Sequence, residues 1–319
     1  MDTKFIYRLY KRSNFLSKVR NFFFQKNIVE IETPALTKYT VTDLHLFPLQ
    51  VIMDNKQDDL KSTLWLITSP EYHMKRLLSD GFGPMYQICH AFRDNEYGKL
   101  HNTEFTILEW YQPFYNMFDM IELIEIFLNN IFHILYSDKS SYEDIFMKFL
   151  NINPLSTDIQ ELNSILYNHG HKHLIHKENN ISDLLSIIFN IFIEKKLGLY
   201  RPIFIYHYPF QQALLAKINQ YDLRIADRFE IFFKGIEIGN GFCELIDADE
   251  QYRRFNHENN LRVYRNLKKR CIDQRFISSL RSIYMPDCSG VAIGLDRIVM
   301  ILLNVCSIKE IISFDDKSC

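Results

Sequence analysis

The chain has 319 residues, of which 47% are hydrophobic and 24% charged, and this composition excludes a mainly disordered protein. Its formal net charge of −2 excludes a global basic field that would hold nucleic acid by counterion release. No apolar run approaches the roughly 20 residues that span a bilayer, and no signal-peptide hydrophobic region opens the chain. We therefore expect a cytoplasmic protein without a membrane partner.

The cysteines support the same compartment, because none of the six forms a CxxC pair or a zinc-like spacing with histidine. We expect reduced thiols at positions 89, 243, 271, 288, 306 and 319. The first 26 residues carry seven positive charges and one negative charge, Asp2, which is either a solvated helix face or a docking surface for an acidic partner. The seven are Lys4, Arg8, Lys11, Arg12, Lys18, Arg20 and Lys26.

The first elements follow from apolar spacing and from turn residues. Helical periodicity over residues 13–26 predicts an amphipathic helix that ends near Asn27, a residue that tolerates left-handed backbone. A strand with a proline follows at 29–34. A short strand at 64–68 then leads through Pro70 into a helix.

The rest of the chain predicts further strands and a long helical stretch. Residues 117–200 repeat apolar positions at helical spacing and show no chemistry. Since most strands would pair as hairpins with helices appended, we predict an α+β fold, an antiparallel β-sheet flanked by helices, in one domain over 1–319. The other predicted elements are strands at 85–93 and 104–111, a hairpin at 228–238, a polar helix at 251–270 and a strand entering a helix at 290–303.

Polar residues gather on one face of the strand at 104–111. Alternation places four side chains there at steps of roughly 7 Å. An aromatic ring, an acid and a phenol on one face indicate either a ligand site or a mixed edge strand. Arg93, which ends the preceding strand, could clamp a phosphate bidentately, as a lysine could not. The four residues on the face are Phe105, Ile107, Glu109 and Tyr111.

A second acidic site is predicted in the hairpin. A two-residue turn at Lys234 and Gly235 sets Phe232 opposite Glu237, so that Glu230 and Glu237 share a face. Two carboxylates that close repel unless a cation lies between them, and Mg²⁺ bridging to phosphate is one such cation. A pair of exposed surface acids is the alternative.

Three ordered motifs resemble those of the class II aminoacyl-tRNA synthetases: residues 30–34 resemble motif 1, residues 92–109 motif 2 and residues 294–297 motif 3. Within that class, residues 68–76, 104–111 and 235–244 are similar to the lysyl branch. Residues 40–45 and 285–294 are more similar still to the elongation factor P–(R)-β-lysine ligases, the short paralogues of lysyl-tRNA synthetase.

The resemblance implies a site for ATP. Arg93 would hold the α-phosphate, Phe105 and Arg297 would enclose adenine, and Glu230 and Glu237 would hold Mg²⁺. The two arginines would be catalytic. Further ATP-binding residues on the matching motifs are Asp94, Asn95, Asn102, Glu237, Ile238 and Gly294. Asn95 stands where the family usually has glutamate, although its carbonyl can still accept the adenine amino group.

The resemblance also implies a site for a lysine-like amino acid. Glu244 with Tyr111 would bind the distal ammonium group, and Glu71 with Asn240 would orient the α-end. Glu71 has a structural alternative, because with Thr68 as N-cap it would complete a capping box. The substrate-binding residues implied are Ser69, Pro70, Glu71, Glu109, Tyr111, Asn240 and Glu244.

The resemblance implies a ligase that activates (R)-β-lysine with ATP and transfers it to a lysine of elongation factor P. We expect no anticodon-binding domain before motif 1, which argues against tRNA as a partner. The resemblance to motif 1 implies a homodimer in which residues 28–36 contribute to the interface. Ala292, where the synthetases usually have glycine, favours the β-amino acid over α-lysine. The alternatives are a truncated lysyl-tRNA synthetase and a non-catalytic amino-acid-binding paralogue.

Overall fold

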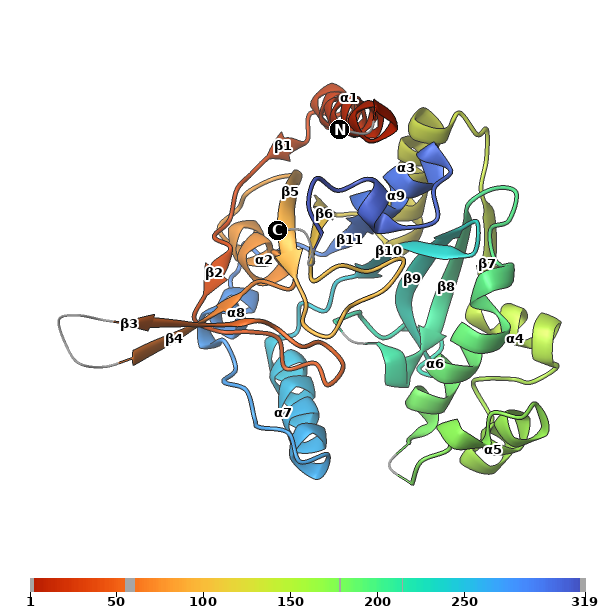
Figure 1. Cartoon of the computed structure of the whole chain (residues 1–319). Coiled ribbons are helices and arrows are strands. Elements are labelled where there is room, and N and C mark those ends of the chain that lie inside the picture. The colour runs from red at the N-terminus through yellow and green to blue at the C-terminus, as the bar shows by residue number, and fades with distance from the viewer. Residues whose placement is uncertain (1–2, 55–60, 178, 214, 316–319) are drawn as a thin grey trace. The chain divides into compact units, whose positions relative to one another are not determined.

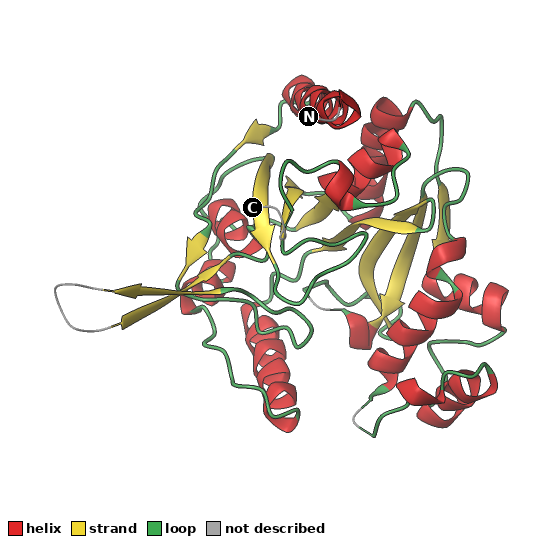
Figure 2. Cartoon of the chain, in the orientation of Figure 1, coloured by secondary structure: helices red, strands yellow, loops and turns green. Residues whose placement is uncertain are grey.

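The computed structural model of the protein describes residues 3–54, 61–177, 179–213 and 215–315 (Figures 1 and 2). Two compact units form: unit 1 from Met1–Phe114 with Ile246–Cys319, and unit 2 from Tyr115–Leu245. Asp2 and Cys319 lie outside the described residues. The single domain remains a prediction, while the α+β class is confirmed by the strands and helices of both units.

Unit 1 is built on four strands in the order β1-β5-β6-β11, with β1 parallel to β5 and the other pairs antiparallel. The strands predicted at 85–93 and 104–111 are confirmed as β5 and β6. Their regular pairing confirms that Phe105, Glu109 and Tyr111 share a face. The bounds are β1 Val29–Glu30, β5 Met85–Phe92, β6 Glu104–Pro113 and β11 Cys288–Gly294.

The N-terminal helix α1 spans Thr3–Gln25 and so begins ten residues before the predicted start. Its end is as predicted, because Asn27 has a φ of 55°. The additional turns carry half-buried Phe5, Ile6 and Leu9 and are also held by ion pairs of Arg8 with Glu310 and of Arg12 with Asp296. Arg20 pairs with a carboxylate of the same unit as well. Internal pairing therefore reduces the basic docking surface suggested by the sequence.

The remaining elements of unit 1 are a small sheet and four α-helices. The polar helix predicted at 251–270 ends early, because Asn266 adopts a φ of 58° and the chain folds back. Helix α8 was not predicted. The bounds are β2 Leu36–Thr37, β3 Gln50–Asp54, β4 Lys61–Leu66, α2 Glu71–Ser79, α7 Ala248–Tyr264, α8 Gln274–Leu280, α9 Leu295–Leu303 and the 3₁₀ turn η4 Ile308–Glu310.

Unit 2 contains four strands in the order β10-β9-β8-β7. Its hairpin is confirmed: Lys234 and Gly235 both have positive φ, and Glu237 lies opposite Phe232. The register then shifts between Glu237 and Gly239, a bulge that the sequence did not predict. The bounds are β7 Asp138–Ser141, β8 Ile203–Pro209, β9 Ile225–Phe233 and β10 Ile236–Cys243.

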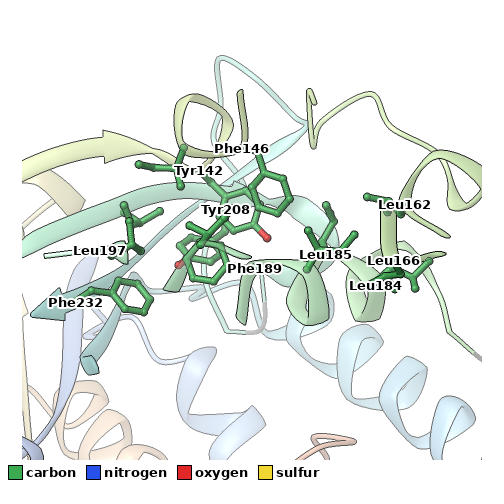
Figure 3. Packing of buried hydrophobic residues seen from close by; sticks show 14 residues of the cluster. Tyr142, Phe146, Leu162, Leu166, Leu184, Leu185, Phe189, Leu197, Tyr208 and Phe232 are labelled. Atoms are coloured by element: carbon green, nitrogen blue, oxygen red, sulfur yellow. The ribbon is translucent and has the colours of Figure 1, made fainter. Parts of the chain in front are cut away.

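Helices cover both faces of the unit 2 strands. The rings of α3 contact Tyr206 and Phe233 on one face. The other face packs against α4, α5 and α6 in a buried cluster that includes Tyr208 and Phe232 (Figure 3). Residues 117–200 are therefore mainly helical, as predicted. The bounds are α3 Met117–Phe132, α4 Tyr142–Leu150, α5 Ile159–Asn168, α6 Ile181–Phe192, η1 Lys172–Leu174, η2 Glu194–Lys196 and η3 Phe210–Gln212.

Two sequence expectations bear on the protein's surroundings. Within the described residues, none of the helices is both long enough and apolar enough to cross a membrane. The five cysteines that the structure describes form no disulfide with one another.

Candidate functional site

Glu109 is the centre of a buried hydrogen-bond network in unit 1. Its carboxyl oxygens accept hydrogen bonds from the Ser69 hydroxyl, with an O–O distance of 2.6 Å, and from the Tyr111 hydroxyl at 2.7 Å. Burial, reinforced by the charge of Glu71, raises the pKa of Glu109 to about 7, although both hydroxyls and Lys75 oppose the rise. A carboxylate held in this way would bind a cationic group strongly.

Glu71 lies at the first position of α2, beside this network. Pro70 is the N-cap residue and no side chain caps the helix, so the alternative of a capping box with Thr68 is wrong. Instead, the Ser69 hydroxyl accepts the Glu71 amide at 3.1 Å, which links the helix start to Glu109. The Glu71 side chain accepts from Lys75 at 2.6 Å.

Lys75 was missed in the sequence, although its spacing of four residues from Glu71 is the spacing of a helical ion pair. Its side chain is fully buried. One ammonium group therefore serves two acids, Glu71 and Glu109, and a second cation beside them would favour the ionised form of Glu109.

A small cavity of about 30 Å³, wide enough to hold water, adjoins the same residues. Its walls come from the end of β4, the start of α2 and the segment that follows β2. The lining residues that matter below are Thr40, Val41, Ser69, Glu71 and Tyr72.

Arg93 follows β5 and is anchored by its amide, which donates to Thr103 at 2.9 Å. Its guanidinium group lies 5.0 Å from the centre of the Phe105 ring and 3.5 Å from a carboxylate oxygen of Glu96. The Nε of Arg93 is buried and has no hydrogen-bond partner among the residues described. Such a donor fits an incoming anion such as phosphate.

The loop after Arg93 places the other predicted ATP-binding residues. The Asp94 amide donates to Phe47, and the Asn95 amide donates to the Asp94 side chain at 2.8 Å. Asn95 is exposed with a φ of 62°. The Asn102 side chain, by contrast, is buried and donates to the Glu104 carbonyl at 2.8 Å, which closes the loop onto β6.

Arg297 lies on α9, whose N-cap is Gly294. Its guanidinium group is 2.7 Å from Nε2 of His101. The preceding residue, Asp296, accepts the Thr106 amide at 2.8 Å and pairs with Arg12 at 2.5 Å. These buried contacts fix the start of α9 against β6. The enclosure of adenine by Phe105 and Arg297 stays a prediction.

In unit 2, the acidic pair on the hairpin lies in a charged setting. Glu230 accepts from Tyr208 at 2.6 Å and from Arg228 at 2.5 Å, and it lies opposite Asn240. Burial raises the pKa of Glu230 to about 7; Arg228 opposes the rise and Glu237 adds to it. The influence of Glu237 agrees with the predicted proximity of the two acids. Sequence reasoning did not identify Arg228.

The remaining predicted residues of unit 2 are Ile238 and Glu244. Ile238 is buried at the bulge between Glu237 and Gly239. Glu244 is also buried and forms an isolated bridge with Ala216. Asn240 accepts from Arg228 at 3.2 Å, which orients its amide. No group of three or more His, Cys, Asp or Glu side chains suited to a metal occurs in the described part of the chain.

Comparison with known proteins identifies related sequences. Residues 2–318 match the family model described as tRNA synthetases class II (D, K and N). The chain is 53% identical over 313 residues to the elongation factor P–(R)-β-lysine ligase of Buchnera aphidicola subsp. Acyrthosiphon pisum (strain APS), covering 98% of this chain and 96% of the relative. It is 42% identical over 311 residues to the ligase of that name from Baumannia cicadellinicola, with 97% and 95% covered.

Proposed function

The chain belongs to the family of class II tRNA synthetases (D, K and N), and from that premise we propose that it is an ATP-dependent ligase that activates (R)-β-lysine as its adenylate and transfers it to a lysine side chain of elongation factor P. The observation that carries the proposal is the similarity to the named ligases along nearly the whole chain. The buried charges of unit 1 support it, because they suit a cationic amino acid.

Amino-acid recognition is assigned first to the acids of unit 1. Glu71 and Glu109 would hold an ammonium group, with Ser69 and Tyr111 fixing the Glu109 carboxylate. Pro70 would set the entry of α2 beside them. From unit 2, Asn240 and Glu244 are further candidates for the polar ends of the amino acid, as the motif resemblance implies.

Adenylate formation requires a cation at the α-phosphate. The substrate carboxylate attacks the α-phosphorus and pyrophosphate leaves, so negative charge develops on the phosphate oxygens. Arg93 would neutralise that charge by exchanging its contact with Glu96 for one with phosphate, and its buried Nε supplies a further donor. Arg297 and Phe105 would bind the adenine ring.

The two acids of unit 2 are of the ligand type that a divalent cation prefers, but they are too few to fill its coordination shell. Glu230 and Glu237 offer the oxygen ligands that Mg²⁺ prefers, and their mutual repulsion favours a cation. Two acids are fewer oxygen ligands than Mg²⁺ takes, so the site would also need the phosphate groups of ATP. Mg²⁺ bound there would offset phosphate charge, while the hydrogen bond from Arg228 holds the Glu230 carboxyl group in place.

In the second step, a neutral lysine amine of the acceptor attacks the carbonyl carbon of the adenylate. An amide bond forms, the bond to phosphate breaks and AMP leaves with the electron pair, while the amine loses its proton. The acceptor amine must first be deprotonated, because a free lysine has a pKa of about 10.4.

Two measurements test the proposal. Amino-acid-dependent pyrophosphate exchange with α-lysine and with both β-lysine enantiomers should be fastest with the (R)-β form. Pre-activated enzyme supplied with labelled β-lysine, total tRNA and purified elongation factor P should label the protein. Label found only in nuclease-sensitive tRNA would instead identify a lysyl-tRNA synthetase, and no exchange with any of the three would indicate a non-catalytic paralogue.

A further inference from the structure

The segment between β2 and β3 is irregular, yet its side chains are buried at every second position. Thr40, Thr42 and Leu44 are 7%, 2% and 5% exposed. A buried segment without a sheet or helix ladder must find partners for its backbone groups elsewhere. We call residues 40–46 the wall segment, because Thr40 and Val41 line the cavity next to Ser69 and Glu71.

Arg270 supplies partners for three of the carbonyls, while the Asp43 side chain accepts hydrogen bonds from the amides of His45 and Leu46. Its Nη1 donates to the carbonyl of Val41 at 2.7 Å and to that of Asp43 at 3.3 Å, and its Nη2 donates to that of Leu46 at 2.9 Å. One planar guanidinium group therefore joins three carbonyls of the wall segment. A lysine could not reproduce this arrangement, because its ammonium group is a single point.

Helix α7 adds two more side chains that hold the wall segment, and we call Arg270, Arg262 and Glu258 together the clamp. Arg262 donates to the Asp43 carbonyl at 3.2 Å, and Glu258 accepts the Leu44 amide at 3.2 Å. The backbone of Arg270 is itself fixed to the helix, since the Asn259 side chain accepts its amide at 2.8 Å and donates to its carbonyl at 3.0 Å.

The same helical layer supports the cavity from a second side. Tyr72, which lines the cavity, stacks on Phe276 of α8 with ring centres 4.4 Å apart and lies 5.8 Å from Phe255 of α7. Burial lowers the pKa of Arg270 to about 10, so that it keeps its charge at neutral pH. Both sides of the cavity thus depend on side chains from the C-terminal part of unit 1.

We propose that Arg270, with Arg262 and Glu258, positions the wall segment and thereby sets the fit of the amino acid against Ser69 and Glu71. These are positioning residues, because they act through backbone carbonyls and an amide and not by touching substrate. The assignment to amino-acid recognition rests on the proposed function. The clamp itself rests on the contacts above.

The test compares two substitutions. Arg270→Lys keeps the positive charge and loses the planar guanidinium group that joins three carbonyls, whereas Arg262→Lys affects one carbonyl of the wall segment. The control is Arg253→Ala, which removes an exposed ion pair with Glu250 on the same helix. Hydrogen exchange of the amides at 41–46 should accelerate about tenfold in Arg270→Lys and less in Arg262→Lys, since charged hydrogen bonds are lost. Exchange in the control should equal that of the unaltered protein.

Pyrophosphate exchange then separates recognition from folding. In Arg270→Lys, KM for the amino acid should rise about tenfold while KM for ATP changes less than about twofold. Equal rises in both constants, or faster amide exchange with an unchanged KM for the amino acid, would overturn the proposal. If the unaltered protein activates no lysine-like amino acid, the proposed function fails, and unchanged amide exchange in Arg270→Lys would separately disprove the clamp.

Discussion

Ala292 on β11 lies directly opposite Glu109 on β6 in the antiparallel pair of the two strands. Opposite residues in such a pair project from the same face with their Cβ atoms about 5 Å apart. The methyl group of Ala292 therefore lies on the same face as the carboxylate that Ser69 and Tyr111 hold. This places the residue that was expected to select the substrate beside the acid that was expected to bind it.

Replacing Ala292 with glycine should shift preference toward α-lysine. Removing one methyl group next to Glu109 enlarges the space at the amino group, and a single methyl discriminates by roughly 1–3 kcal/mol. We expect the ratio of kcat/KM for (R)-β-lysine over α-lysine to fall about tenfold in pyrophosphate exchange. A ratio equal to that of the unaltered protein would show that Ala292 does not select.

The stability of the protein without substrates should fall as pH rises from about 4.5 to 7. Glu109 has a raised pKa of about 7, so the folded state retains a proton that the unfolded state loses above about 4.5. Once Glu109 is ionised in both states, the free energy of unfolding is lower by roughly 3 kcal/mol. Glu230 and Glu258, whose pKa values are also raised to about 7, act in the same direction.

Urea unfolding at intervals between pH 4.5 and 8 measures this dependence. Glu109→Gln keeps the size of the side chain and removes its titration. The unfolding free energy should therefore depend less steeply on pH between 4.5 and 7, by an amount equivalent to at most one proton released on unfolding. Glu32→Gln, at an exposed position of the same unit, should leave the slope unchanged. A Glu109→Gln profile that parallels that of the unaltered protein would mean that Glu109 is ionised throughout.

Arg297→Ala should cripple adenylate formation and leave the fold intact. Asp296 fixes the start of the helix through Thr106 and Arg12, so removal of the Arg297 side chain, with its contact to His101 and its stacking on adenine, should leave the helix in place. We expect kcat/KM for ATP to fall at least about tenfold, the value of a desolvated cation–π contact. Arg281→Ala, which removes an exposed pair with Asp249, serves as the control. Unaltered exchange kinetics would remove the adenine assignment.

We predict a homodimer with residues 28–36 in its interface. Within this segment, Val29 is 50% and Leu36 is 42% exposed, an apolar surface that a symmetric partner would cover. Light scattering at micromolar concentration should give twice the mass of the chain, and Val29→Asp should shift the mass toward the monomer. A monomer at all concentrations would contradict the prediction.

Local patterns predicted much of this structure. Alternation gave β5 and β6, and the Lys234-Gly235 turn gave the hairpin together with the position of Glu237 opposite Phe232. Contacts between residues far apart in the chain could not be predicted from local sequence patterns. The first turns of α1 depend in part on ion pairs with Glu310 and Asp296, which lie far along the chain and leave no local pattern in the sequence. For the same reason, the parallel pairing of β1 with β5 was not foreseen.

In the candidate site too, local features were predicted and most long-range contacts were not. Strand alternation predicted that Glu109 and Tyr111 share a face, and the family resemblance grouped Ser69 with them; the hydrogen bonds of Glu109 to both hydroxyls agree with this grouping. The partners that balance charge were missed. Lys75 has a local signal in its spacing from Glu71, whereas Arg270 binds carbonyls more than 220 residues away and has none.

The contacts of Asp296 also order events during synthesis. Arg12 and Thr106 leave the ribosome long before their shared carboxylate is made, so unit 1 cannot close until translation is nearly finished. Unit 2, one continuous stretch of chain, is complete earlier and can fold first. A nascent chain that stops short of residue 296 would carry a half-built unit in which Arg12 and the Thr106 amide lack their shared carboxylate, a natural target for cellular quality control.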